Sequence, residues 1–398
     1  MRPAFEVADI FRRHGGSYRQ ENAGHLGRGE RRVMGAIEAC RTPRLGGHVD
    51  ACDACDDCGK TRISYNSCRN RHCPKCQGAA RKEWIDARIA DLLPVPYFHV
   101  VFTLPRDVAE IAFQNKSVVY GLLMRISAEA LQTIAANSKW LGAEIGVTAV
   151  LHTWGQAITH HPHVHCVVPG GGLSPDRTRW INCRSGFFLP VRVLSRLFRR
   201  LFLTALAEAF AKSELQFFND LAHLNDDKTF ARHLARTRSI EWVVYSKPPF
   251  GGPDQVLAYL GRYTHRVAIA NSRIVHADGD HVAFRWKDYR GNGRDREKIM
   301  RLHPHEFIRR FLLHLLPDGF HRMRHFGFLA NCHRRDRISL YRSLLGEPAP
   351  TSGQSHSTRS QQANSNECPD CRRPMRRTGV TLAPVAPPRP SSFRCDTS

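Results

Sequence analysis

The chain has 398 residues, 42% of them hydrophobic, which suits two or three globular domains with ordinary cores. Its 59 Lys and Arg residues against 36 Asp and Glu give a net charge of +23, which favours nucleic acid as the partner over a small-molecule substrate. The N-terminus lacks a signal-peptide pattern and no apolar run reaches membrane-spanning length, so we expect a cytoplasmic protein with no membrane partner. In that compartment the 13 cysteines indicate metal binding more than disulfides.

The N-terminal part combines helices with a cysteine-rich segment. Helical spacing of apolar residues covers much of residues 1–39, and seven cysteines follow in the loop-rich segment 40–77. Two Cys-x-x-Cys knuckles separated by fourteen residues predict a four-thiolate structural zinc site: Cys55, Cys58, Cys73 and Cys76. Cys52 leaves the choice of knuckle open, because Cys52-x-x-Cys55 has the same spacing. A second, interleaved zinc site could use the remaining ligand-type residues: Cys40, His48, Cys68 and His72.

Two arginines between the knuckles, Arg69 and Arg71, suggest that the zinc segment contacts DNA. The alternative is a purely structural zinc module. Residues 81–93 resume helical spacing, and two prolines then mark a domain boundary. The sequence YFHVVFTLP predicts a buried strand, with His99 in the core or in a supporting position, and a long helical region follows over about 106–138.

Residues 151–172 carry the most specific pattern, with His163-Val164-His165 at its centre. Side chains at positions i and i+2 of a strand point to the same face, so the two imidazoles could hold one metal ion. If the segment 147–154 pairs with this strand, Gln156 returns towards His163 as a third, oxygen ligand, which suits Mg²⁺ or Mn²⁺. The alternative is a pair of ordinary strand histidines. His303-Pro304-His305 has the same spacing, yet it opens an apparent helix and predicts no site.

The remaining elements are predicted in the following order. Residues 192–218 are strongly helical, residues 240–245 form a short buried strand, and a helix then begins near residue 254. A β-hairpin surrounds Asp278-Gly279, and helices occupy about 304–345. The composition after residue 347 shifts to Ser, Pro, Gln, Arg and Thr, which predicts a disordered basic tail over 347–398. We expect the Cys368-x-x-Cys371 knuckle in this tail to be an unoccupied half-site.

The helix near residue 254 carries Tyr259 and Tyr263 one turn apart on the same face. Arg262 and Arg266 flank them, and Lys247 precedes them, so we list all three as candidate DNA contacts together with the arginines of the zinc segment. A phenol is a poor nucleophile until a cation polarises its target phosphate. The alternative is an aromatic pair that packs in the core.

In combination these motifs resemble the HUH endonucleases, and more closely the two-tyrosine rolling-circle transposases of bacterial insertion sequences, the IS91 type. The resemblance spans residues 15–346, and the segments that carry it are YNSCRNRHCPKCQ, YFHVVFTLP, LHTWGQ, HPHVHCVVPGGG, KPPFGGPDQVLAYLGRYTHRVAIAN and EFIRRFLLHLLPDGFHRMRHFGFLAN. It implies an α+β fold: an antiparallel sheet with helices, preceded by a small helical zinc-binding domain and followed by the disordered tail. The corresponding domains are 1–93, 94–346 and 347–398.

The resemblance also implies a reaction. His163, His165 and Gln156 would hold Mg²⁺ or Mn²⁺, and Tyr259 and Tyr263 would attack single-stranded DNA at the element's ends, leaving a 5′-phosphotyrosine before strand transfer. A bacterial, nucleoid-associated location follows from this role. Two alternatives stay open: a plasmid-type replication initiator or relaxase with the same chemistry, and a non-catalytic zinc-dependent DNA-binding regulator.

Overall fold

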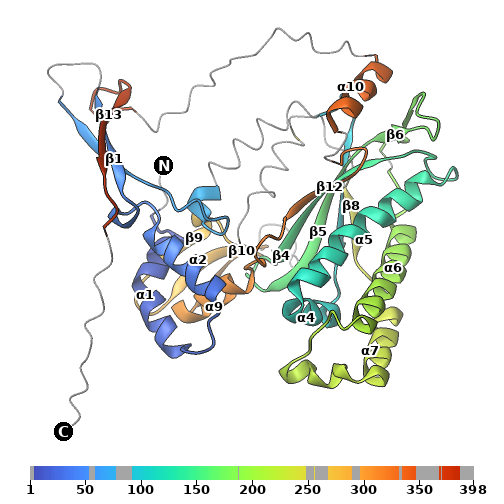
Figure 1. The fold of residues 1–398 in the computed structure, drawn as a ribbon, viewed down its shortest axis with the longest axis horizontal. Coiled ribbons are helices and arrows are strands. Elements are labelled where there is room, and N and C mark those ends of the chain that lie inside the picture. The colour runs from blue at the N-terminus through green and yellow to red at the C-terminus, as the bar shows by residue number, and fades with distance from the viewer. Residues whose placement is uncertain are drawn as a thin grey trace. The chain divides into compact units, whose positions relative to one another are not determined.

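The computed structural model describes residues 4–52, 59–77, 92–186, 188–247, 255, 268–288, 296–330, 334–346, 367–368 and 370–385 (Figure 1). The chain divides into two compact units, one formed by Met1–Gln77 with Thr351–Ser398 and the other by Gly78–Pro350. The second unit overlaps residues 94–346, and the assignment of that range as the catalytic domain stays a prediction. The first differs from prediction because it combines the two ends of the chain.

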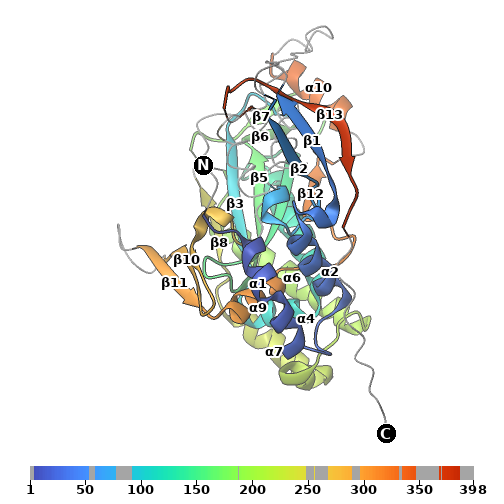
Figure 2. The same cartoon turned by 90° about the vertical axis from the view of Figure 1, so that its left-hand side faces the viewer.

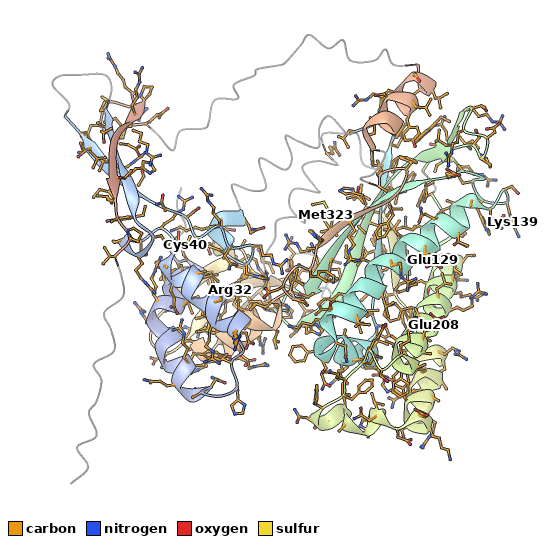
Figure 3. The ribbon with its side chains drawn as sticks, in the orientation of Figure 1. Arg32, Cys40, Glu129, Lys139, Glu208 and Met323 are labelled. Carbon is orange, nitrogen blue, oxygen red and sulfur yellow. The ribbon has the colours of Figure 1, made fainter. Side chains whose placement is uncertain are left out.

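The first unit contains a helix pair and a small sheet. Helices α1 (Val7–Glu21) and α2 (Arg28–Ala39) bury one apolar side each, including Phe11 and Met34. Arg19 of α1 forms an ion pair with Glu38 of α2, and its Nη2 lies 2.7 Å from both carboxylate oxygens. After the 3-10 turn η1 (Pro43–Leu45), strands β1 (Gly47–Cys52) and β2 (Thr61–Tyr65) form an antiparallel hairpin. Figure 3 labels Arg32 on α2 and Cys40 directly after it.

The third strand of this sheet comes from the C-terminal segment that the sequence predicts to be disordered. Strand β13 (Met375–Leu382) pairs antiparallel with β1, so the sheet order is β13-β1-β2. The prediction is therefore corrected for residues 375–382; the stretches 347–366 and 386–398 lie outside the described residues. The strand escaped prediction because most of its side chains are polar, and its partner is more than 300 positions away along the chain.

The second unit is built on a five-stranded sheet of order β12-β4-β5-β3-β8. Its strands are β3 (Tyr97–Thr103), β4 (Gly146–Trp154), β5 (His160–Pro169), β8 (Val244–Lys247) and β12 (Met323–Gly327), and all neighbours are antiparallel. The strand that carries the predicted histidine pair, β5, is the central one. The strand β12 falls inside the segment 304–345 predicted as helical, and that assignment is corrected for residues 323–327.

Helices cover one face of this sheet (Figures 1 and 2). Helix α5 (Lys116–Ala136) packs on β4 and β5, and α6 (Val191–Ala211) packs beside α5 and against β8. Alternate strand residues such as Val100, Phe102, Val164 and Cys166 are fully buried beneath them. The outer sides of the helices are charged, as Glu129 on α5 and Glu208 on α6 illustrate (Figure 3). The covered face is thus the main hydrophobic core.

Loops and cap residues set the helix boundaries. The long helical region predicted over about 106–138 consists of two helices, α4 (Arg106–Gln114) and α5, which are divided at Asn115. The Asn115 side chain bonds the backbone N–H and carbonyl of Gln216 instead. Helix α6 ends at Ala211, seven residues before the predicted end. Ser213 there adopts a positive φ of 58°, and the chain continues extended so that Leu215 and Phe217 enter the core.

Among the described residues, the opposite face of the sheet is covered at one end. Tyr97 and Val167 pack there beneath Ile338 and Tyr341 of α10 (Arg334–Leu344).

Smaller elements lie around the main sheet. Strands β6 (Gly171–Leu173) and β7 (Trp180–Asn182) form a small separate ribbon. Helix α7 (Asp227–Ser239), preceded by the 3-10 helix η2 (Asn219–Asn225), extends the helical layer. The predicted hairpin at Asp278-Gly279 is confirmed as β9 (Ile274–Ala277) and β10 (Val282–Lys287), with η3 (Asn271–Arg273) before it.

Two further elements complete the unit. Strand β11 (Glu297–Leu302) pairs with β10, and helix α9 (Pro304–Leu313) follows. The predicted helix start at His303 is confirmed, because its side chain caps α9 by accepting from the His305 N–H. Among the described helices none combines the length and apolar character needed to cross a membrane.

Gly327 at the end of β12 provides a test of this packing. Its φ is +62°, and an added Cβ would lie 2.0 Å from the Ile145 carbonyl oxygen. Gly319 has a similar φ of +71° with nothing within 4 Å of an added Cβ, so it is a matched control. We expect Gly319→Ala to cost about 1 kcal/mol from backbone strain alone, and Gly327→Ala to cost roughly 3 kcal/mol because the backbone must also shift.

The measurement is urea unfolding followed by tryptophan fluorescence. All six tryptophans lie within residues 78–350, so the signal reports the second unit. Equal losses of stability in the two variants would show that the close approach of Gly327 to Ile145 does not constrain the sheet.

Candidate functional site

The other end of this face, which no described helix covers, carries a row of histidines. On β5, His163 and His165 point to the face opposite the buried Val164 and Cys166, as strand alternation requires. The register places Thr103 and Val101 of β3 beside them, and Val101 in turn pairs with Tyr245 of β8. The predicted histidine pair therefore lies on the one part of the sheet that neither α5 nor α10 covers.

A third histidine comes from β4. His152 lies directly opposite His163, and the register shifts by one residue between His152 and Trp154. The register from Thr148–Val167 to His152–His163 is unbroken, so strand alternation alone turns His152 to the same face as His163, and the shift lies beyond this pair, towards Trp154. A ring nitrogen from each of His152, His163 and His165 lies within 4.8 Å of the others. Their ring centroids are 4.3–5.4 Å apart.

Hydrogen bonds orient two of these rings. His163 Nδ1 lies 2.7 Å from the His161 carbonyl oxygen, which can only accept, so Nδ1 carries the proton and Nε2 keeps a lone pair. His165 Nδ1 lies 2.7 Å from Nε2 of His99, whose ring is stacked on it and is 1% exposed. With Nδ1 as donor to His99, His165 also presents Nε2. This is the support that metal-ligating histidines receive in proteins.

Burial keeps the rings neutral. Desolvation lowers the pKa of His163 to about 4 and that of His99 to about 3, and it lowers the pKa of His165 well below its ordinary value. The positive charge of Lys247, paired across the sheet with His99, adds to the lowering of the pKa of His99 and His165. Since a metal binds the neutral imidazole, the lowered pKa of His163 and of His165 favours the form of these two rings that can hold a divalent ion.

The histidines line a cavity of about 800 Å³. Trp154, whose ring stacks on His152 with centroids 4.6 Å apart, and Arg273 form other parts of the wall. The turn between β4 and β5 forms the rim, and Ile158 within it adopts a φ of +57°, a strained conformation for a β-branched residue. Such a residue persists only where neighbouring groups hold it in place.

Three side chains from downstream elements hold this turn. Arg273 Nη2 donates to the Gln156 carbonyl at 2.5 Å, and Arg310 Nη1 donates to the Ala157 carbonyl at 3.1 Å. His314 Nε2 lies 3.2 Å from the Ile158 carbonyl oxygen. The cavity rim is therefore fixed by η3 and α9, which come more than 100 residues later in the chain.

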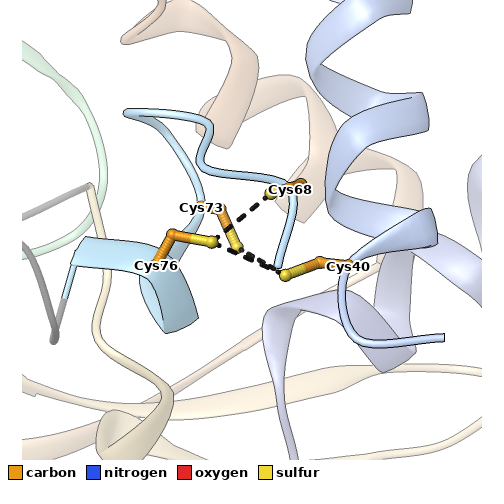
Figure 4. Close-up of side chains that lie close together, drawn as sticks. All are labelled: Cys40, Cys68, Cys73 and Cys76. Carbon is orange, nitrogen blue, oxygen red and sulfur yellow. Dashed lines mark hydrogen bonds between the residues drawn. The ribbon is translucent and has the colours of Figure 1, made fainter. Parts of the chain in front are cut away.

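Four cysteines form a separate cluster in the first unit (Figure 4). The sulfur of Cys76 lies 3.6 Å from that of Cys40 and 3.5 Å from that of Cys68, and the Cys73 and Cys40 sulfurs are 3.7 Å apart. Four thiolates about 2.3 Å from a tetrahedral zinc ion would be about 3.8 Å apart. Hydrogen bonding among the four thiols lowers the pKa of Cys40 to about 7 and lowers that of Cys76, while it raises the pKa of Cys68 and of Cys73.

Comparison with known proteins places the chain in a family. Residues 10–104 match a family model described as "Transposase zinc-binding domain", and residues 146–337 match one described as "Putative transposase". A Sinorhizobium fredii (strain NBRC 101917 / NGR234) protein named "Putative transposase y4qJ" is 61% identical over 351 residues, which cover 88% of this chain and 87% of that protein. The chain belongs to the IS91-type transposase family.

A more distant relative agrees with this assignment. The transposase for insertion sequence element IS801 of Pseudomonas savastanoi pv. phaseolicola is 28% identical over 297 residues, covering 74% of this chain and 68% of its own length. Among solved structures, the metal-bound conjugative relaxase TrwC in complex with oriT DNA is 12% identical, covers 64% of this chain and 73% of its own, and has a TM-score of 0.25. That score is too low to transfer any detail of a site.

The family and the α+β fold predicted from the sequence motifs are thus confirmed, and the protein is a DNA-processing transposase with a zinc-binding domain. The structure describes some of the predicted site residues and not others. It brings His163 and His165 together and adds His152, which the sequence analysis missed. Gln156 lines the same cavity, and its role as a ligand stays a prediction.

The candidate nucleophiles lie outside the described residues, as do the basic residues that flank them: Tyr259, Tyr263, Arg262 and Arg266. Lys247 is exposed at the end of β8, on the histidine face. In the zinc unit Arg69 is exposed and Arg71 is half-buried, both in the loop that leads to Cys73. Contact of these three residues with DNA stays a prediction.

The structure groups the zinc-type ligands differently from the predicted assignment. Cys73 and Cys76 lie with Cys40 and Cys68, which the sequence analysis had assigned to a second site with His48 and His72; Cys55 and Cys58 lie outside the described residues. The difference arises because Cys40 follows α2, and the helix returns it to the 68–76 loop. His48, on β1, instead lies 3.5 Å from a carboxylate oxygen of Asp50. His72, although buried, is not among the clustered ligands.

The buried His314 gives a pH dependence that can be tested. Desolvation lowers its pKa to about 3, whereas an unfolded histidine titrates near 6.5. Below pH 6.5 the unfolded chain therefore binds a proton that the folded chain does not, and the second unit should lose stability as pH falls from 6.5 towards 3, by roughly 1.4 kcal/mol per pH unit for this residue. His314→Gln keeps a donor near the Ile158 carbonyl but does not titrate, so this contribution should disappear.

Urea unfolding curves at pH 7.5, 6.0 and 5.0, followed by tryptophan fluorescence, measure the slope. At pH 7.5 both forms are neutral, so that curve isolates any change in packing caused by the substitution. An identical slope in wild type and His314→Gln would contradict a neutral, buried His314.

Proposed function

We propose that this transposase nicks single-stranded DNA at the ends of its element, using a divalent ion held by His152, His163 and His165 and a tyrosine nucleophile. The observation that carries the proposal is the convergence of three imidazoles on one cavity. Three nitrogen donors form a softer set than two imidazoles and an amide oxygen, so Mn²⁺ fits better than Mg²⁺. When bound, such an ion polarises the scissile phosphate and offsets its charge.

The protein side chains then supply positioning and the nucleophile. Lys247 at the end of β8 and Arg273 at the rim add positive charge around the cavity, which favours the approach of a phosphodiester. The phenol oxygen of Tyr259 or Tyr263 attacks phosphorus as the phenol proton is lost. The Tyr–O–P bond forms, the bond from phosphorus to the 3′-oxygen breaks, and the 3′-oxygen gains a proton. The products are a 5′-phosphotyrosine and a free 3′-hydroxyl.

The second tyrosine gives the site a way to transfer strands. After the first attack, the other phenol can accept a second strand end, so that two covalent ends are held in one site before joining. We also propose that Cys40, Cys68, Cys73 and Cys76 bind a structural zinc ion, which holds the 68–76 loop and its arginines in place for contact with DNA. Support for DNA as the partner comes from the family and from the net charge of +23.

The role assigned to His99 predicts an effect on metal affinity. His99→Phe removes the acceptor for the His165 Nδ1–H, and second-layer changes of this kind weaken metal binding by about 10–100-fold. His99→Gln retains an acceptor oxygen near that position and should weaken it less. Mn²⁺ titration followed by electron paramagnetic resonance measures the affinity of each protein. If all three bind Mn²⁺ equally, His99 does not orient the site.

The nucleophile assignment predicts a covalent adduct. With Mn²⁺ and a labelled single-stranded oligonucleotide of the element end, the wild type should form an adduct that maps to Tyr259 or Tyr263 by peptide mass. The Tyr259→Phe/Tyr263→Phe protein should form none. His163→Ala should also form none while its DNA affinity changes by less than about threefold, because phosphate contacts dominate affinity.

The alternatives give other outcomes in the same assay. An adduct that persists in the double tyrosine variant would mean that the nucleophile is misassigned. DNA binding by the wild type without any metal-dependent cleavage would favour the non-catalytic regulator. Cleavage of a plasmid origin but not of element ends would favour the replication initiator.

A further inference from the structure

We propose that the chain holds a second zinc ion between its two ends, bound by Cys52, Cys368 and Cys371. The sulfurs of these three cysteines lie within 4.8 Å of one another, and those of Cys52 and Cys371 are 3.3 Å apart although 319 residues separate them in the sequence. The zinc-binding domain matched by the family model ends at residue 104, so it does not include the C-terminal pair. The knuckle that the sequence presents as an isolated half-site thus has a partner thiol.

The backbone shapes the C-terminal pair into a tight turn. The Cys368 N–H donates to the Arg373 carbonyl at 2.8 Å, and the Arg372 N–H donates to the Cys368 carbonyl at 2.9 Å. Arg372 adopts a φ of 59°, which closes the turn, and Glu367 bridges to Pro374 behind it. Cys368, which is 1% exposed, and Cys371 are therefore held on the same side of a compact loop, as the two thiolates of a zinc knuckle must be.

Strand pairing brings this loop to Cys52. Cys52 ends β1 and pairs in register with Met375, the first residue of β13 and a buried side chain. On the other side of Cys52, its N–H donates to the Lys60 carbonyl at 3.0 Å, and Lys60 forms an ion pair with Asp370 at 2.7 Å. The third thiol is therefore placed by a sheet and by an ion pair, each independent of the sulfur contacts.

The chemistry of the donors favours zinc. Three thiolates on one side of a tetrahedral zinc ion would be about 3.8 Å apart, and these three sulfurs lie within 4.8 Å of one another, so small side-chain shifts would bring them to a common ion, with a further donor or water completing the tetrahedron. The site resembles the Cys40 cluster in donor type but joins segments from opposite ends of the chain. Its occupation would hold β13 on the sheet of the first unit, because the zinc closes the loop between Cys52 and the C-terminal segment.

Zinc content of the reduced full-length protein tests the proposal. The measurement uses the His163→Ala/His165→Ala background, so that the histidine site does not contribute. We expect about two zinc ions per chain, one from each cysteine cluster. Cys368→Ser/Cys371→Ser and Cys52→Ser should each lower this by about one, and Cys73→Ser/Cys76→Ser should remove the other zinc. Cys183→Ser, in the second unit, is the matched control and should leave the zinc content unchanged.

Two further measurements separate loss of the site from misfolding. Cys371→His keeps a zinc-binding side chain and should retain about two zinc ions. In the Cys368→Ser/Cys371→Ser protein, amide hydrogen exchange should accelerate at residues 375–382 and stay slow in α1 and α2. A zinc content that Cys368→Ser/Cys371→Ser leaves unchanged would overturn the proposal. So would a Cys52–Cys371 disulfide found by non-reducing peptide mapping in protein that carries only the Cys40-cluster zinc.

Discussion

The register between β4 and β5 is the constraint on which the candidate active site depends. Each strand presents apolar side chains to the helices on one face and histidines to the other, so a slip of one residue would exchange the two sets. The register runs unbroken from Thr148–Val167 to His152–His163 and shifts only beyond that pair, towards Trp154. The unbroken part keeps Leu151 in the core and sets His152 opposite His163, and the rest of the site is arranged around that pair.

Support for this register comes from both sides of the sheet. On the covered face, Val164 and Leu151 pack beneath α5, and burial of that apolar area fixes the strands against sliding. On the open face, His99 orients His165, while Arg273, Arg310 and His314 hold the strained turn that joins the two strands. The core therefore sets the position of the histidines, and hydrogen bonds from later elements set their orientation.

The sequence allowed the family, the α+β fold and the pair on β5 to be predicted, because strand alternation in a motif such as His-Val-His is a local property. It did not reveal His152, since the sequence alone does not set the register of β4 against β5, and that register places His152 opposite His163. The zinc ligands show the same limit. Spacing identified Cys73-x-x-Cys76, but its partners Cys40 and Cys68 depend on how α2 ends, and Cys52 meets Cys371 only through the pairing of β1 with β13.

The central claim is that one divalent ion binds three imidazoles on the open face of the sheet. Pulsed electron paramagnetic resonance of bound Mn²⁺ tests it directly, in protein whose histidines are labelled with ¹⁵N, because each directly bound ring nitrogen gives a hyperfine coupling. The account predicts three ¹⁵N couplings in the wild type and two in His152→Ala. Two couplings in the wild type that His152→Ala leaves unchanged would contradict it. The third ligand of the ion would then be Gln156 or water.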